Sequence, residues 1–119
     1  MYSWGDQYKG QLGTLPAGTD WTHGIKGLQH KPTVVPLPEG TVPKKVVAGG
    51  IHAAILSEEG ELFTYGCGSD GRLGHPEYEG YVYLYKESQP KRVELFAASG
   101  QKVIDVSSSY YHMMALAKA

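Results

Sequence analysis

Short runs of apolar and β-branched residues alternate along this chain with turns rich in glycine and proline. Each run spans only about four to six residues, which is typical of a β-strand and too short for most helices. Eight runs predict strands, namely Tyr2–Gly5, Thr33–Leu37, Lys45–Ala48, Ala53–Ser57, Glu61–Tyr65, Lys91–Phe96, Lys102–Val106 and His112–Ala117. No helical periodicity accompanies them, so the pattern predicts an all-β protein of about eight short antiparallel strands.

The clearest pair of predicted strands lies at the centre of the chain. Ala53–Ser57 runs into a short polar turn, and Glu61–Tyr65 runs back. Gly60 ends this turn and can adopt the positive φ that a tight connection requires. The sequence therefore predicts an antiparallel hairpin at this point.

The chain carries the same succession of motifs twice. An aromatic–polar–aromatic–Gly block precedes a Gly–polar–Leu–Gly block, at Tyr2–Gly5 with Gly10–Gly13 and again at Phe63–Gly66 with Gly71–Gly74. Gly5 and Gly66 lie 61 positions apart, and His52 and His112 lie 60 apart. Two independent landmarks at nearly one spacing indicate a repeat protein.

This spacing divides the chain into a first repeat, residues 1–61, and a second repeat, residues 62–119. Each repeat contains four predicted strands, which is the strand count of one blade of a β-propeller. Each also contains a long loop, at residues 14–31 and 75–89. Because loops on repeat scaffolds vary and bind, function is expected where the two repeats differ.

A third block follows in each repeat, at Gly50–Leu56 and Tyr110–Leu116, with the histidine in third place. Through these three blocks the chain resembles the regulator-of-chromosome-condensation repeat family, and the resemblance covers nearly everything except the long loops. It implies a seven-bladed β-propeller, of which this chain holds two consecutive repeats. The second repeat departs from the pattern, because Ser109 and Tyr110 stand where the first repeat has Gly49 and Gly50.

The recurring residues are predicted to have structural roles. They are Trp4, Gly5, Gly10, Gly13, His52, Tyr65, Gly66, Gly71, Gly74 and His112. The glycine spacing alone could be taken for a phosphate-binding loop, but that motif needs a helix after it, and Pro16 and Pro76 follow instead. A histidine present in every repeat predicts a ring that hydrogen-bonds backbone between neighbouring strands.

Residues of the two long loops are the candidates for binding a partner. They are Trp21 and His23 in the first loop, with Tyr78, Tyr81, Tyr83 and Tyr85 in the second. The run Tyr81–Tyr85 alternates, which places its tyrosines on one face. Such a face suits a protein contact, because tyrosine is enriched at interface hot spots, or an extra strand whose rings cover the edge of a blade.

Composition excludes several classes of function. The net charge is −1, from 11 basic and 12 acidic residues, so the electrostatic footprint of a nucleic-acid binder is absent. The single cysteine rules out an internal disulfide, and no spacing of histidines and carboxylates predicts a metal or cofactor site. Neither a signal peptide nor an apolar run of about 20 residues is present, which predicts an intracellular protein of the nucleus or cytoplasm.

These observations favour a non-enzymatic protein-interaction module without catalytic residues. The family resemblance implies an alternative, part of a guanine nucleotide exchange factor for a Ran-like small GTPase that also docks on chromatin. The implied partners are a small GTPase, a histone or a component of the ubiquitin pathway. A small hydrolase would need a convergent polar cluster, which the sequence does not show. Two repeats on their own leave strand edges open, which predicts further blades or self-association.

Overall fold

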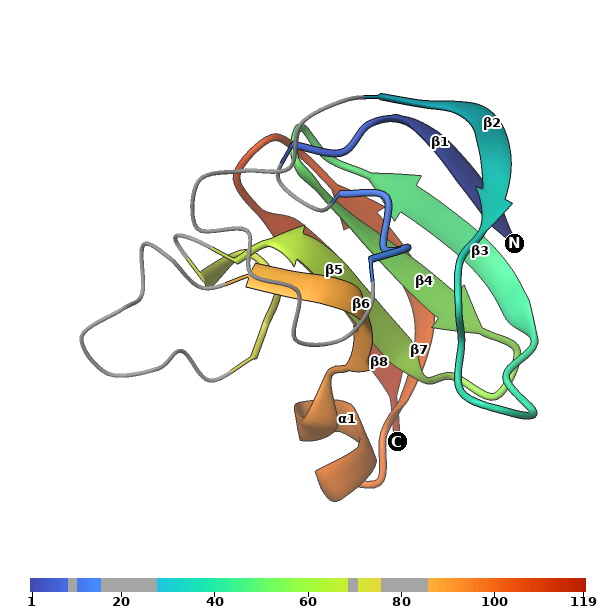
Figure 1. Cartoon of the computed structure of the whole chain (residues 1–119). Helices are drawn as coiled ribbons and strands as arrows, with labels where there is room; N and C mark the ends of the chain where they lie inside the picture. The colour runs from blue at the N-terminus through green and yellow to red at the C-terminus, as the bar shows by residue number, and fades with distance from the viewer. Residues whose placement is uncertain (9–10, 16–27, 69–70, 76–85) are drawn as a thin grey trace.

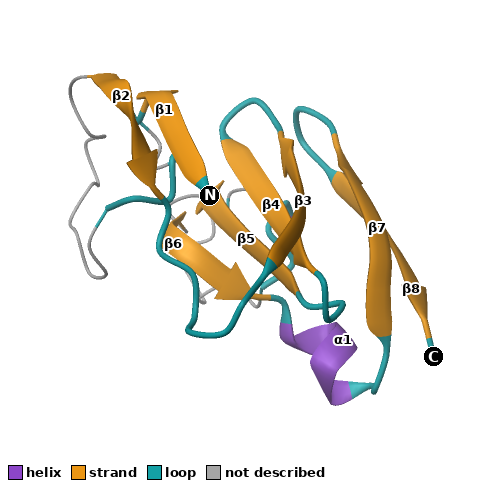
Figure 2. Ribbon diagram, turned by 90° about the vertical axis from the view of Figure 1, so that its right-hand side faces the viewer, coloured by secondary structure: helices purple, strands orange, loops and turns teal. Residues whose placement is uncertain are grey.

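The computed structural model describes residues 1–8, 11–15, 28–68, 71–75 and 86–119 (Figure 1). Its elements are β1 (Tyr2–Asp6), β2 (Leu28–Val34), β3 (Pro43–Ala48), β4 (His52–Ser57), β5 (Leu62–Cys67), β6 (Lys86–Arg92), α1 (Glu94–Ala98), β7 (Lys102–Ser108) and β8 (Met113–Lys118). They form three antiparallel sheets: the pair β1–β2, the four-stranded sheet β3–β4–β5–β6 and the pair β7–β8. Figure 2 shows the two pairs on opposite sides of the central sheet, side by side like blades of a propeller.

The complete blade does not coincide with a sequence repeat. Its strands β3 and β4 come from the first repeat, whereas β5 and β6 come from the second. The predicted count of four strands per repeat is confirmed, and the four strands of each repeat are divided between two sheets. The physical reason is the tight turn between β4 and β5, which holds two consecutive strands in one sheet, while the longer connection after β2 leads to the next sheet.

The predicted central hairpin is present. Strands β4 and β5 pair in register from Ala53 opposite Tyr65 to Leu56 opposite Leu62. Gly60 in their turn has φ +87°, and its carbonyl oxygen accepts a hydrogen bond of 2.9 Å from the Val103 N–H of β7. The turn thus completes the blade and also fastens it to the following strand pair.

The side chains of β4 alternate between two hydrophobic clusters, one on each face of the central sheet. Leu56 packs in the cluster that contains Val106 of β7. Ile55 packs in the other cluster, with Phe63 of β5 and with Val35, which follows β2. All six residues of β4 are buried, because a neighbouring strand pair covers each face. A strand covered on both faces reads as a continuous apolar run, and each large side chain buried there stabilises the fold by about 1.5–3 kcal/mol.

Two strand predictions and the two loop boundaries are wrong. The strand predicted at Thr33–Leu37 is β2, which ends at Val34 and begins at Leu28, inside the predicted first loop. The strand predicted at Lys91–Phe96 is β6, which begins at Lys86, inside the predicted second loop, and ends at Arg92. Both β2 and β6 contain a proline and lie at the edge of their sheets, where a missing N–H is tolerated.

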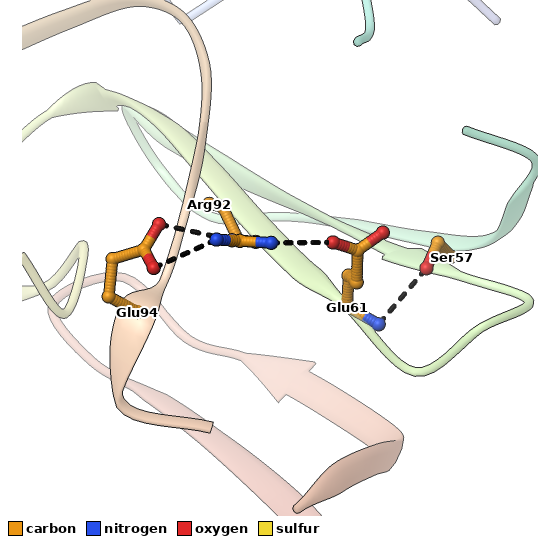
Figure 3. A network of polar contacts seen from close by, with 4 residues as sticks. All are labelled: Ser57, Glu61, Arg92 and Glu94. Carbon is orange, nitrogen blue, oxygen red and sulfur yellow. Dashed lines mark hydrogen bonds and ion pairs between the residues drawn. The ribbon is translucent and has the colours of Figure 1, made fainter. Parts of the chain in front are cut away.

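The last residues of the second wrong strand form the short helix α1, although the sequence shows no helical periodicity there. An arginine fixes this change of direction (Figure 3). Arg92 donates to the carboxylate of Glu94 through Nε and Nη2, both at 3.0 Å, and to Glu61 Oε2 through Nη1 at 3.1 Å. These bonds hold the pKa of the Glu94 carboxyl below its usual value, so a negative charge sits in the first turn of α1, where the helix favours it.

Candidate interaction surface

The two repeated glycine-containing blocks contact one another in each repeat through the same hydrogen bond. The Ser3 hydroxyl of β1 donates to the Leu12 carbonyl at 2.7 Å, and the Thr64 hydroxyl of β5 donates to the Leu73 carbonyl at the same distance. Ser3 and Thr64 hold the polar position between the two aromatic residues of their blocks. Each Gly–polar–Leu–Gly turn is thus fastened to the middle of a strand by one side chain.

The turn of the first repeat packs on the aromatic strand of the second. Gly13 has φ +70°, and a Cβ atom at this position would lie 2.7 Å from the ring of Tyr65. The Tyr65 side chain is 2% exposed, and burial raises its pKa to about 12. A glycine is therefore required at position 13 for two reasons: the backbone has a positive φ, and the ring of Tyr65 leaves no room for a Cβ atom.

His52 occupies the equivalent tight position on the next boundary, between the central blade and β7. Its Nε2 lies 2.9 Å from the Ser108 hydroxyl, and a Cβ atom on Gly49 would collide with its ring. The partner is a side-chain hydroxyl rather than the backbone group that the repeat predicted. Burial, together with electrostatic repulsion from Arg72 and His112, lowers the pKa of His52 to about 4. The ring is consequently neutral at pH 7 and joins two blades.

One cluster of exposed side chains stands out at the turn between β7 and β8. Tyr110 and Tyr111 are 56% and 61% exposed, with ring centroids 4.8 Å apart and planes at 61°. The buried Arg72 guanidinium lies 5.1 Å from the Tyr111 ring centroid, and its Nη1 donates to the Tyr110 carbonyl at 3.3 Å. The arginine stacks below one ring and holds the turn, so two aromatic faces are presented to solvent in a fixed arrangement.

The sequence reasoning did not select these three residues, although a signal for them was available. In the alignment of the two repeats, Arg72 corresponds to Gln11, Tyr110 to Gly50 and Tyr111 to Ile51. The second repeat has thus replaced small or neutral residues by an arginine and two tyrosines. From the sequence alone, this difference indicates only a loss of glycines. In the structure the turn keeps its geometry, because Ser109 N donates to His112 O at 2.9 Å, as Gly49 N donates to His52 O at 2.7 Å.

A hollow of about 320 Å³ opens beside this cluster, between the central blade and β8. Its lining includes Leu73 and Gly74 of the second glycine turn, Val93 and Phe96, and Met113 of β8. Most of its lining is apolar, and no acid–base pair faces into it among the described residues that line it. Such a site can receive an apolar or aromatic side chain rather than carry out bond chemistry.

The loop residues predicted to bind a partner lie outside the described residues. They are Trp21, His23, Tyr78, Tyr81, Tyr83 and Tyr85, and their role stays a prediction. Gly10, predicted to be structural, also lies outside. Within the described ranges, no group of three or more histidine, cysteine, aspartate or glutamate side chains could hold a metal ion. Among the described residues there is no helix that is long and apolar enough to cross a membrane.

Three adjacent antiparallel sheets, joined through recurring glycine turns, define this chain as a segment of a β-propeller. The Regulator of chromosome condensation (RCC1) repeat matches residues 1–56 and again residues 59–116. The chain therefore belongs to this repeat family, as its motifs indicate.

Several known proteins are similar to the chain over most of its length. The mouse (Mus musculus) E3 ubiquitin-protein ligase HERC2 is 36% identical over 107 residues, which are 90% of this chain and 2% of that protein. The Regulator of chromosome condensation of Xenopus laevis is 34% identical over 91% of this chain and 22% of that protein. The crystal structure of Prp20p from Saccharomyces cerevisiae superposes with a TM-score of 0.75 at 26% identity, over 97% of this chain and 26% of that chain. The chain thus spans about a quarter or less of each of these proteins.

Proposed function

We propose that this chain is a non-enzymatic protein-interaction segment of a propeller, and that Arg72, Tyr110 and Tyr111 form its contact surface. One observation carries the proposal: a buried arginine holds two exposed tyrosines at a position where the other repeat has a glycine and an isoleucine. Arginine and tyrosine are the residue types that dominate interface hot spots. Their rings lose little conformational freedom on binding, because the arginine already orders them.

The relatives indicate which partner to test first. Prp20p was described together with its binding properties to Gsp1p and histones. A small GTPase or a histone is accordingly the partner that we propose for this chain. A ubiquitin-pathway component is a further candidate, because HERC2 is named an E3 ubiquitin-protein ligase.

The test measures binding of the chain to core histones and to a Ran-like GTPase, for the natural sequence and for Tyr110→Ala and Tyr111→Ala. We expect each substitution to weaken binding by about fivefold or more, which corresponds to about 1 kcal/mol. Tyr8→Ala is the matched control, since Tyr8 is also an exposed tyrosine, 46% accessible, on the far repeat. Unchanged binding by both variants, or an equal loss with the control, would contradict the proposed surface.

Exchange on a GTPase is the second candidate, favoured by the similarity to the Regulator of chromosome condensation and to Prp20p. An exchange factor stabilises the nucleotide-free GTPase and needs no bond chemistry, so it requires surface loops rather than a catalytic cluster. Release of labelled GDP from a Ran-like GTPase, measured with the chain and with its intact parent protein, decides between the candidates. Faster release of GDP at substoichiometric amounts of the protein would favour the exchange-factor function over the binding module.

We also propose that the two functional units are residues 1–61 and 62–119. The family match ends at residue 56 and resumes at residue 59, which supports a boundary in the turn between β4 and β5. Limited proteolysis within this turn, followed by native mass measurement, tests whether the two halves stay associated.

A further inference from the structure

The connection between β6 and β7 differs from the corresponding connection of the first repeat. After β6 and Val93 the chain forms α1 and then turns at Gly100, which has φ +71°. The first repeat has Pro36 and Pro38 in this place, and residues 35–42 contain no helix, because two closely spaced prolines disfavour one. Figure 2 shows α1 at the end of the central sheet, ahead of β7. The helix is therefore a feature of the second repeat alone.

A hollow of about 220 Å³ lies beside this helix, and we call it the helix hollow. Its walls come from the turn between β4 and β5, from α1 with the turn that follows it, and from the start of β7. The apolar part of the lining is formed by Leu62, Val93, Phe96 and Ala97. Every lining residue lies between positions 59 and 102, in the complete central blade or in the connection that leaves it. The hollow is smaller than a site for a whole cofactor, and it admits one long side chain.

One carboxylate of the lining is held in place from two sides. The Glu61 N–H donates to the Ser57 hydroxyl at 3.0 Å, and Glu61 Oε2 accepts from Arg92 Nη1 at 3.1 Å (Figure 3). The other oxygen, Oε1, makes no hydrogen bond to the described residues. Glu61 is therefore positioned by the fold and keeps an acceptor for a further donor.

Negative charge exceeds positive charge around the helix hollow. The charged side chains on its lining or next to it are four carboxylates and two cations, namely Glu58, Glu59, Glu61 and Glu94 with Arg92 and Lys102. The charge of Arg92 is shared between two of these carboxylates. Glu59 is exposed and forms no ion pair within the described residues. Such a rim attracts a cationic group and repels an anionic one.

We propose that the helix hollow binds a lysine side chain of a partner protein. The apolar stem of the lysine packs against Phe96 and the other apolar walls, and its ammonium group binds the carboxylates of Glu59 and Glu61. An ammonium group is compact and donates three hydrogen bonds, so one lysine can bond both carboxylates at once. The hollow thus combines the two parts that recognise this side chain, an apolar wall and a fixed anionic rim.

This contact is separate from the surface formed by Arg72, Tyr110 and Tyr111. Strand β7 begins at Lys102, beside the helix hollow, and ends at Ser108, next to the turn that carries the tyrosines. The two contacts therefore lie at opposite ends of one strand. The lysine site neither requires the tyrosine surface nor is required by it.

The test uses two capped short peptides that differ in a single side chain. One peptide carries a lysine among alanine, glycine and serine residues, and the other carries norleucine, which has the apolar stem but no ammonium group. Backbone amide signals of the isotope-labelled chain are followed by NMR during each titration. We expect the lysine peptide to shift the amides of residues 59–62 and 92–102 in a saturable manner. The norleucine peptide should bind at least about fivefold more weakly, because the charged contact is missing.

Three substitutions test the carboxylate and the hollow itself. Glu59→Gln removes one carboxylate at an exposed turn position and should weaken binding of the lysine peptide by about threefold or more. Ala97→Leu enlarges an exposed lining side chain of α1 and should abolish binding, because it fills the space. Glu39→Gln is the matched control, since it removes the same charge from an exposed position in the helix-free connection of the first repeat, and it should leave binding unchanged.

Arg92→Gln distinguishes a positioned carboxylate from a diffuse negative field. The substitution makes the rim more negative, but it also removes the bonds that hold Glu61 and Glu94. A diffuse field would bind the lysine peptide more tightly in this variant, which would overturn the inference. The proposed site predicts weaker binding, because the carboxylate of Glu61 is no longer held at the hollow.

Equal binding of the two peptides, or equal weakening by Glu59→Gln and Glu39→Gln, would also overturn the inference. Unchanged binding in the Ala97→Leu variant would do so as well, as would shift changes scattered over the whole chain. Spectra of the free variants, unchanged away from the substitution, establish that each one is folded. Tyr110→Ala should leave binding of the lysine peptide intact, so failure of this site and failure of the tyrosine surface are told apart.

Discussion

His52 and His112 hold the same position in the two repeats, yet their surroundings differ completely. His52 is 1% exposed, lies under Gly49 and contacts Ser108 of the following strand pair. His112 lies exposed at the margin of β8, and the described residues place no later strand pair against it. The comparison shows that the repeated residues do not generate their own environment. Each repeated residue packs against the neighbouring unit and is buried only when that unit is present.

The largest difference between the two repeats is expected at the strand glycines Gly5 and Gly66. A Cβ atom on Gly66 would lie 2.6 Å from the Ile51 carbonyl oxygen and 2.9 Å from the His52 Cα, whereas nothing lies within 4 Å of one on Gly5. Both have positive φ. We expect Gly66→Ala to lower the free energy of unfolding by about 3 kcal/mol or more, and Gly5→Ala by about 1–2 kcal/mol from backbone strain alone. Urea unfolding of the two variants measures both losses. Equal losses would show that the neighbouring strand does not matter.

The histidine pair should give the next largest difference. His52→Ala removes a buried ring and leaves Ser108 without this partner, so we expect a loss of about 2–3 kcal/mol. His112→Ala changes an exposed side chain and should alter stability by less than about 0.5 kcal/mol. The denaturant midpoints of the two variants, compared with that of the natural chain, measure this difference in stability. A large effect at His112 would mean that β8 is covered already in the single chain.

Acid should distinguish the two histidines as well. The pKa of His52 is lowered to about 4 in the folded chain, so the unfolded chain binds its proton first, near pH 6.5. Its contribution to stability is therefore fully present above pH 6.5 and is lost as the pH falls toward 4, by about 1.4 kcal/mol for each pH unit at the steepest part. Between pH 6.5 and 4, the free energy of unfolding should therefore fall more steeply with pH for the natural chain than for His52→Gln. His75, whose pKa is also lowered by burial, adds a loss in the same direction that both proteins share.

The two strand hydroxyls allow a finer comparison. Thr64 bonds both the Leu73 carbonyl and His75 Nε2, at 2.7 and 2.8 Å, whereas the bond of Ser3 is to the Leu12 carbonyl. Thr64→Val should cost about 1–2 kcal/mol, because it removes two buried hydrogen bonds, and Ser3→Ala about 0.5–1 kcal/mol. Thermal unfolding of both variants checks the order. A larger loss at Ser3 would contradict the view that burial sets the difference.

The smallest effect is expected at the exposed ion pair of Lys45 and Asp105. Both side chains are about half exposed, and salt screens such a pair. Asp105→Asn should therefore leave the unfolding midpoint of the single chain unchanged within measurement error. A clear loss of stability at low salt would show that the pair contributes to the fold despite its exposure.

Local sequence determined the central part of the fold well and its margins poorly. The alternation and the Gly60 turn were sufficient to predict the β4–β5 hairpin, because its two strands pair across a short turn between neighbouring segments of the sequence. Strands β2 and β6 were misplaced because they carry Pro32 and Pro90, which local propensity reads as breaks and which an edge position tolerates. The division of repeats among blades could not be predicted from spacing, since a period does not say which strand begins a sheet.

The candidate surface shows the same limit. The alignment of the repeats located the residues that both units share, including Gly13, which lies against the ring of Tyr65. It places Arg72 against Gln11 of the first repeat, but this difference alone does not indicate what the arginine contacts. Its importance arises from its distance to Tyr111, which lies 39 positions further along the chain and is brought close only by packing of β7 and β8 on the central blade.

The offset between sequence repeats and sheets has a consequence for how such genes change length. The junction between units falls inside the β4–β5 hairpin and not between two sheets. A tandem duplication of one whole unit at this junction would therefore insert four strands. Two of them complete the preceding sheet and two complete the following sheet, so every internal sheet keeps four strands, and deletion of a unit has the same result. The number of blades can thus change by recombination between repeat units. An inserted unit forms backbone hydrogen bonds with the units on both sides of it without further substitutions.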